Sequence, residues 1–85
     1  MNLEHKTQEQ PINYFPNGSM VRVVSLDAGK CAFSRLCAMG LVPGTLVQVF
    51  RNGKGPVRLK FRDTELVLGR SFAEKIIARL TRNND

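Results

Sequence analysis

The chain has 85 residues, 42% of them hydrophobic, which suits one domain and leaves little room for a buried catalytic cleft. No apolar run is long enough to span a bilayer, and residues 1–10 lack the apolar block of a signal peptide, so the sequence predicts a cytoplasmic protein. The net charge of +6 indicates an acidic partner, an anionic membrane surface or a nucleic acid, without choosing among them.

The N-terminal third of the chain predicts an arm, a strand and a helix, in that order. Residues 1–13 are polar and lack hydrophobic periodicity, which favours a disordered arm. Residues 20–25 read as the first strand, and Asp27 can cap a helix over residues 30–39. The apolar positions of this helix have the spacing of one buried face: Phe33, Leu36, Cys37 and Gly40.

A cluster of chain-breaking residues follows the predicted helix. Gly40 can adopt the left-handed conformation that ends a helix. Pro43 pushes Val42 into an extended conformation, and Gly44 permits a sharp reversal. We therefore expect a rigid corner over residues 40–45, and rigid corners on small barrels often present surfaces to partners.

The remaining residues predict strands joined by tight turns. Residues 45–51 form the expected second strand, and Asn52-Gly53 favours a type I′ hairpin. Residues 57–62 alternate apolar and basic side chains, which is typical of a strand with one buried face.

Two further strands and a second helix are expected near the C-terminus. Residues 65–68 and 76–80 read as strands, and Ser71 with Glu74 has the spacing of a capping box for a one-turn helix. Five short strands with two small helices predict a mainly β fold, a compact barrel, followed by a flexible tail over residues 81–85.

The corner and its flanks resemble the signature of the FeoA family, the small ferrous iron transport protein A. The family pattern is R-L-x-x-L-G-L-x-P-G-x-x-V-x-V, and this chain follows it from Arg35 to Val49, with Met39 where leucine is usual. The closing L-R-x-x-E-A-x-x-I segment is matched less well, because Gly69 replaces the arginine and Phe72 the glutamate. The loop over residues 52–56 also lacks the acid that many members carry.

The resemblance implies an SH3-like small β-barrel over residues 14–80, with the longer helix inserted between the first two strands. It also implies a cytoplasmic accessory protein of bacterial ferrous iron uptake. The implied partner is the membrane transporter FeoB with its cytoplasmic GTPase portion, so membrane contact is expected only through that partner. Self-association is left open.

Strand alternation suggests which side chains face a partner. Val47, Val49 and the apolar residues of 57–61 should point inward, which leaves Leu46 and Phe50 outside. These two form a patch with the corner, unless the helix or the arm covers them. The basic residues of the third strand form either a docking stripe or a solvated edge. The predicted partner-binding residues are Leu41, Val42, Pro43, Gly44, Leu46, Phe50, Arg58, Lys60 and Arg62.

Other kinds of site find weaker support, and we predict neither a metal site nor a cofactor. His5, the single histidine, lies in the arm, and Asp27 and Cys31 do not make a ligand set by themselves. Cys31 and Cys37 lie six residues apart on the helix and should remain free thiols. The glycines of residues 52–55 could cradle a phosphate, but a hairpin turn explains them better.

Catalysis and nucleic-acid binding are also disfavoured. The serines have no histidine in the folded region to act as a base, so we predict no catalytic residues. Phe61, the aromatic on the basic strand, should point inward and offers bases no stacking platform. The alternatives kept are a nucleic-acid-binding barrel and a relative of the last domain of metal-dependent repressors, which normally follows a winged-helix and a dimerisation domain not seen in this sequence.

Overall fold

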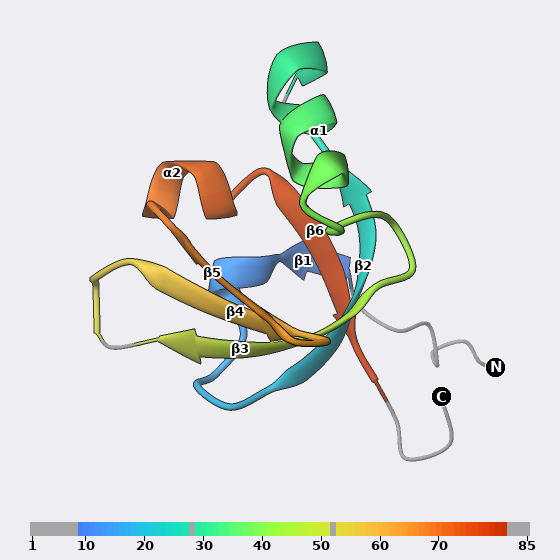
Figure 1. Cartoon of the computed structure of the whole chain (residues 1–85). Coiled ribbons are helices and arrows are strands. Elements are labelled where there is room, and N and C mark those ends of the chain that lie inside the picture. The colour runs from blue at the N-terminus through green and yellow to red at the C-terminus, as the bar shows by residue number, and fades with distance from the viewer. Residues whose placement is uncertain (1–8, 28, 52, 82–85) are drawn as a thin grey trace, which may run out of the picture.

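In the computed structural model of the chain, which describes residues 9–27, 29–51 and 53–81, a strongly curved sheet surrounds the hydrophobic core (Figure 1). Two short α-helices and one 3₁₀ helix complete it. The elements in chain order are β1 (Glu9–Pro11), η1 (Ile12–Tyr14), β2 (Met20–Leu26), α1 (Gly29–Ala38), β3 (Leu46–Arg51), β4 (Val57–Phe61), β5 (Thr64–Leu68), α2 (Arg70–Ala73) and β6 (Ile76–Leu80).

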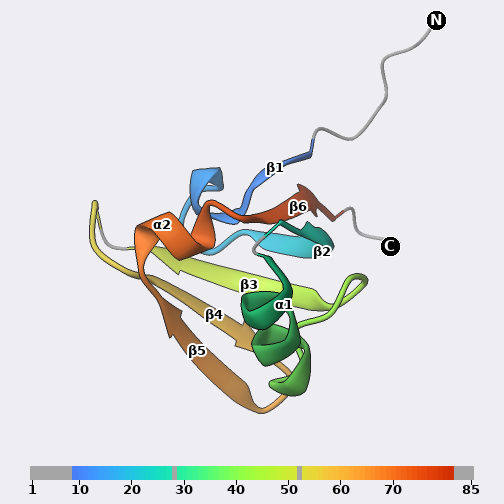
Figure 2. The same ribbon diagram turned by 90° about the horizontal axis from the view of Figure 1, so that it is seen from above.

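The strands pair antiparallel in the order β1-β6-β2-β3-β4-β5. The edge strands β1 and β5 do not pair with each other within the described residues, so hydrogen bonds do not close the barrel there. Helix α1 is inserted between β2 and β3, and α2 lies between β5 and β6 (Figures 1 and 2). The prediction of a mainly β fold with short helices is confirmed, with β1 as an additional strand. The described residues include no helix that is both long and apolar enough to cross a membrane.

The core is built from the alternating residues of the central strands. Val57, Leu59 and Phe61 of β4 are buried, and Val47 and Val49 of β3 are buried beside them. Val49 and Leu59 are directly paired across the two strands. Strand alternation therefore predicted the inner face correctly, because a residue step of two returns each side chain to the same side of the sheet.

Helix α1 meets the core only near its C-terminal end. Leu36 is fully buried and Cys37 half-buried, but Phe33 is 41% exposed. The prediction that Phe33 belongs to the buried face is wrong, because the first turns of the helix stand away from the sheet (Figure 1). The helix begins next to residue 28, which lies outside the described residues, so capping by Asp27 stays a prediction.

The N-terminal segment differs from the predicted arm from Glu9 onward. Glu9–Pro11 pairs with β6, and Ile12 in the following 3₁₀ helix is fully buried. Phe15 is also buried, whereas Tyr14 is 60% exposed. Hydrophobic periodicity could not identify this segment, because it is fixed to the barrel by main-chain pairing with β6 and by the buried side chain of Ile12. Residues 1–8 and 82–85, the rest of the predicted arm and tail, lie outside the described residues.

One predicted turn and one predicted helix cap differ in the structure. Arg51 pairs with Val57, so the β3–β4 hairpin has a loop over residues 52–56 and not a two-residue type I′ turn. Gly53 in this loop has a φ of 64°, while Asn52 lies outside the described residues. The capping box is wrong: Ser71 lies within α2, and Gly69 occupies the N-cap without a side-chain hydrogen bond.

Candidate partner-binding surface

The corner over residues 40–45 is closely tied to the body of the protein. Gly40 and Gly44 have φ angles of 97° and 96°, values that favour glycine, as the sequence predicted. The hydroxyl of Thr45 donates to the carbonyl oxygen of Gly40 at 3.3 Å and accepts from the backbone N–H of Val42 at 3.2 Å. The N–H of Gly44 also donates to the carbonyl oxygen of Val23 at 2.7 Å. The corner is therefore joined both to itself and to strand β2.

The side chains of the corner do not form the apolar patch that the sequence predicted. Leu41 is fully buried in the core, so it cannot touch a partner without unfolding. Val42 is half-buried, and only Pro43 and Gly44 are exposed. The guanidinium of Arg22 covers part of the corner by donating to the carbonyl oxygen of Gly44 at 2.9 Å. This corner is chiefly a structural element, and its accessible part is small.

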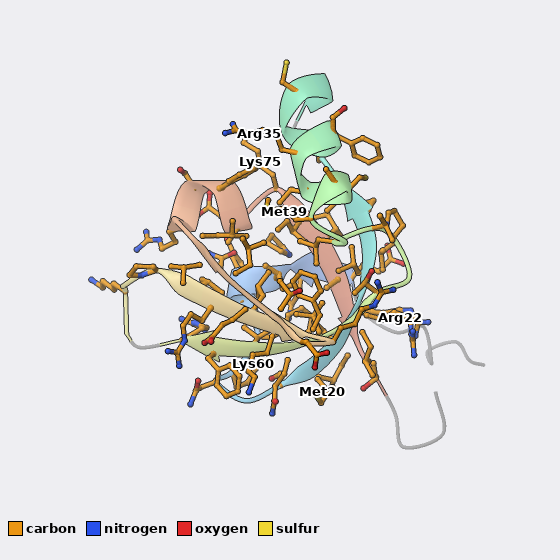
Figure 3. All side chains as sticks on the ribbon, viewed as in Figure 1. Met20, Arg22, Arg35, Met39, Lys60 and Lys75 are labelled. Atoms are coloured by element: carbon orange, nitrogen blue, oxygen red, sulfur yellow. The ribbon has the colours of Figure 1, made fainter. Side chains whose placement is uncertain are left out.

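The register of the sheet shows which side chains share its outer face. Met20, Gln48, Lys60 and Glu65 form one row across β2, β3, β4 and β5. Met20 and Lys60 lie on the opposite side of the sheet from helix α1 (Figure 3). Phe50, Arg58 and Val67 form the next row, and Leu46 is paired with Arg22. We call the surface made by Met20, Leu46, Phe50, Arg58, Lys60 and Val67 the outer face.

The outer face mixes exposed apolar and basic side chains. Met20, Leu46 and Val67 are 38%, 42% and 57% exposed, and Phe50 is half-buried. A groove of about 520 Å³ lies beside Phe50 and Val67. The sequence identified Leu46 and Phe50 but missed Met20 and Val67, because only the strand register places residues so distant in sequence on one surface. The groove is lined by Asn17, Phe50, Arg51, Pro56, Arg58 and Val67.

The three predicted basic residues have different surroundings. Arg58 has its Nε 3.2 Å from a carboxylate oxygen of Glu65, and its guanidinium lies 5.8 Å from the centroid of the Phe50 ring. Lys60 is exposed on the outer face. Arg62 has a φ of 57° and belongs to the turn between β4 and β5, after the end of the strand. The basic stripe on strand β4 is thus Arg58 and Lys60, with Arg58 already paired.

These positions also bear on the other predicted kinds of site. Phe61 is buried, as predicted, but Phe50 on the neighbouring strand supplies an aromatic ring beside the basic stripe. That ring is half-buried and faces Arg58, which limits its use for stacking on bases. Cys31 and Cys37 are free thiols. Within the described part of the chain, no three histidine, cysteine, aspartate or glutamate side chains gather as a set of metal ligands.

Comparison with known protein families gives a match over nearly the whole folded part. The profile of the FeoA domain matches residues 10–80. A Methanocaldococcus jannaschii protein whose name describes it as Fe(2+) transport protein A is 36% identical over 67 residues, which are 79% of this chain and 82% of that protein.

Solved structures share the fold. The solution structure of the FeoA protein from Chlorobium tepidum has a TM-score of 0.73 and 25% identity, over 84% of this chain and 70% of that one. The crystal structure of T. acidophilum IdeR has a TM-score of 0.76 over 94% of this chain but only 37% of that longer one. At 17% identity this second likeness concerns the fold alone, and it supports the SH3-like architecture.

Proposed function

The chain belongs to the FeoA family, and on that premise we propose that it is a cytoplasmic accessory protein of ferrous iron uptake that binds the membrane transporter FeoB. Binding takes place on the cytoplasmic GTPase portion of the transporter. The membrane is reached only through this partner. The barrel acts by contact and does not itself carry iron.

The observation that carries this proposal is the composition of the outer face. Met20, Leu46 and Val67 expose large apolar side chains on a sheet surface whose opposite side forms the core. A surface that exposes several large apolar side chains among charged ones is typical of protein interaction sites. Phe50, with the guanidinium of Arg58 beside its ring, supplies an anchor of the aromatic and arginine type that interfaces favour.

The site therefore shifts from the corner to the strands. Leu41 is excluded by its burial, while Leu46, Phe50, Arg58 and Lys60 remain in the proposed surface. Val42, Pro43 and Gly44 lie at its margin, and Arg62 lies in the turn at one end. Lys60 is placed to attract an acidic partner before contact, because exposed charges act mainly on the rate of association.

Binding of the purified cytoplasmic portion of FeoB to immobilised protein tests the proposal by biolayer interferometry. Val67→Ser and Phe50→Ser should each speed dissociation, with affinity losses of about tenfold or more if they are anchors. Met39→Ser is the matched control, because Met39 is 42% exposed in the turn after α1, away from the outer face. Circular dichroism must first show that each variant is folded.

A charge reversal examines the basic stripe in the same assay. Lys60→Glu should slow association at low salt, and the difference from the wild type should shrink as salt screens the charges. If folded Val67→Ser and Phe50→Ser variants bind like Met39→Ser, the partner surface lies elsewhere. Binding of RNA in place of FeoB would favour the nucleic-acid alternative.

A further inference from the structure

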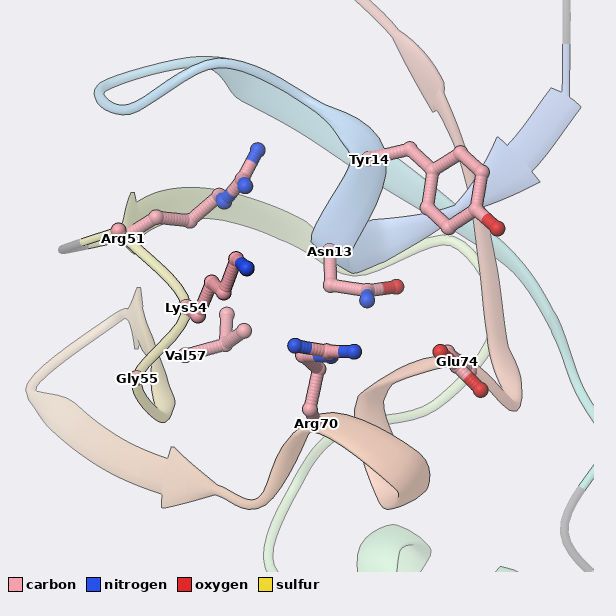
Figure 4. A pocket seen from close by; sticks show the side chains of 9 residues that line it. Asn13, Tyr14, Arg51, Lys54, Gly55, Val57, Arg70 and Glu74 are labelled. Atoms are coloured by element: carbon pink, nitrogen blue, oxygen red, sulfur yellow. The ribbon is translucent and has the colours of Figure 1, made fainter.

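A second concave region lies at the end of the sheet beside the hairpin loop, and three cationic side chains surround it. It shares Arg51 with the groove of the outer face. Arg51 comes from the end of β3, Lys54 from the hairpin loop and Arg70 from the start of α2 (Figure 4). The cavity measures about 390 Å³, a size typical of small-molecule sites. Glu74 provides the one carboxylate of the lining, so the lining residues carry a formal net charge of +2, three cations less one anion.

Within the described parts of the chain, these cationic groups have no anionic partner in an ion pair. Among the residues that the structure describes, neither Lys54 nor Arg70 forms an ion pair. The guanidinium of Arg51 donates there only to a neutral group, the carbonyl oxygen of Phe15 at 3.1 Å. Cations held around one cavity repel each other, and a bound anion relieves that repulsion and accepts charge-assisted hydrogen bonds. Arginine with a second cation is the usual means of holding a phosphate group.

A buried polar group lies in the same cavity. Asn13 is only 8% exposed, and its Oδ1 is buried without a hydrogen-bond partner. The side chain lies beside Arg70, with Glu74 on its other side (Figure 4). A buried acceptor without a donor costs free energy, so native proteins rarely leave one unless a water or ligand serves it. Oδ1 cannot bind a bare anion, so a ligand that supplies its missing donor would also carry a hydroxyl or N–H group.

From the three cations and the unpartnered acceptor of Asn13 in one cavity, we propose that the cavity binds a small phosphate monoester that carries hydroxyl groups, such as a sugar phosphate. The phosphate group lies among Arg51, Lys54 and Arg70. A neighbouring hydroxyl donates to Oδ1 of Asn13, with the carboxylate of Glu74 as a second acceptor. The remaining wall of the cavity is formed by Tyr14, Val57 and the backbone of Gly53 and Gly55.

Titration of ¹⁵N-labelled protein with ribose 5-phosphate, inorganic phosphate and ribose tests this site by NMR. Ribose 5-phosphate should shift the amides of residues 53–55 and 70–74 and bind more tightly than either of the other two compounds. Arg70→Ala and Lys54→Ala should each weaken its binding by about tenfold, the effect of one charge-assisted hydrogen bond. Lys60→Ala is the control, because it removes the same unit of charge from the outer face.

The variant Asn13→Leu tests the contact of the ligand hydroxyl with Asn13 separately from the binding of the phosphate group by the cationic side chains. This variant should bind inorganic phosphate like the wild type but lose most of the preference for ribose 5-phosphate. It should also fold at least as stably, because it removes a buried acceptor that has no partner in the free protein. The proposal is overturned if no compound shifts the residues around the cavity, or if Lys60→Ala weakens binding as much as Lys54→Ala. Both results are independent of FeoB binding.

Discussion

The corner over residues 40–45 and the hairpin loop over residues 52–56 both turn the chain with glycines, but they are held in different ways. The corner buries Leu41 and receives hydrogen bonds from Arg22 and Thr45. The loop joins two strands and contributes the exposed Lys54 to one cavity and Pro56 to the other. The comparison teaches that the turn held by buried side chains and hydrogen bonds stabilises the fold, whereas the exposed hairpin loop borders the two concave surfaces.

Truncation of the most buried residue of the corner should show the largest difference between the two turns. Leu41→Ala should lower the free energy of unfolding by about 2–5 kcal/mol, because it leaves a cavity in the core. Lys54→Ala in the loop should change it by less than about 0.5 kcal/mol, as is usual for exposed positions. Urea denaturation followed by circular dichroism measures both. Equal effects would mean that the corner is not part of the core.

Backbone conformation should give the next largest effect. Gly44→Ala is expected to cost about 1–2 kcal/mol, because its φ of 96° disfavours any side chain even though open space surrounds the position. Gly69→Ala is the matched control: its φ is −64° and a Cβ would also meet open space. Thermal melts compare the two. Similar melting temperatures for both variants would contradict the strain assigned to the corner.

Loss of the Thr45 hydroxyl should lower the free energy of unfolding somewhat less than the Gly44 substitution does. Thr45→Val keeps the shape of this buried side chain but leaves the N–H of Val42 and the carbonyl oxygen of Gly40 without that partner. We expect a loss of about 1 kcal/mol in a denaturant titration. Thr45→Ser retains the hydroxyl and should recover most of the loss. No recovery would indicate that packing of the methyl group matters more than the hydrogen bonds.

The ion pair of the outer face should have the smallest effect on stability. Arg58 and Glu65 are about half exposed, and exposed pairs contribute about 0.2–1 kcal/mol. A double-mutant cycle with Arg58→Ala and Glu65→Ala measures this coupling by chemical denaturation. A coupling well above that range would mean that the outer face stabilises the fold and is less free to serve binding.

The fold was largely readable from the sequence because its signals are local. Alternation from Val57 to Phe61 defined the inner face of β4, and Gly40 and Gly44 have the positive φ angles that their positions indicated. Strand β1 was missed because its contribution is main-chain pairing with β6, which leaves no pattern in the side chains. Phe33 was misplaced because periodicity does not show how much of a helix the sheet covers.

The candidate surfaces were less predictable because they depend on long-range register. Met20 and Val67 share the outer face only through the successive pairing of β2 with β3, β3 with β4 and β4 with β5. Asn13 and Arg70 line one cavity although they are far apart in sequence. The resemblance to a family gave the architecture and the expected partner, but the position of Leu41 in the core had to come from the structure.

The strand order has a consequence for synthesis on the ribosome. Among the strands that the structure describes, β6 is made last, and it lies between β1 and β2, the first two. Glu9 pairs with Arg79, and Val21 pairs with Leu80, so neither early strand can find this neighbour until the C-terminal residues have left the exit tunnel. Contacts so distant in sequence also slow the closing step of folding. The nascent barrel therefore exposes the edge of β2 that pairs with β6 until residues 76–80 have emerged, and a chain truncated before residue 76 would retain that open edge.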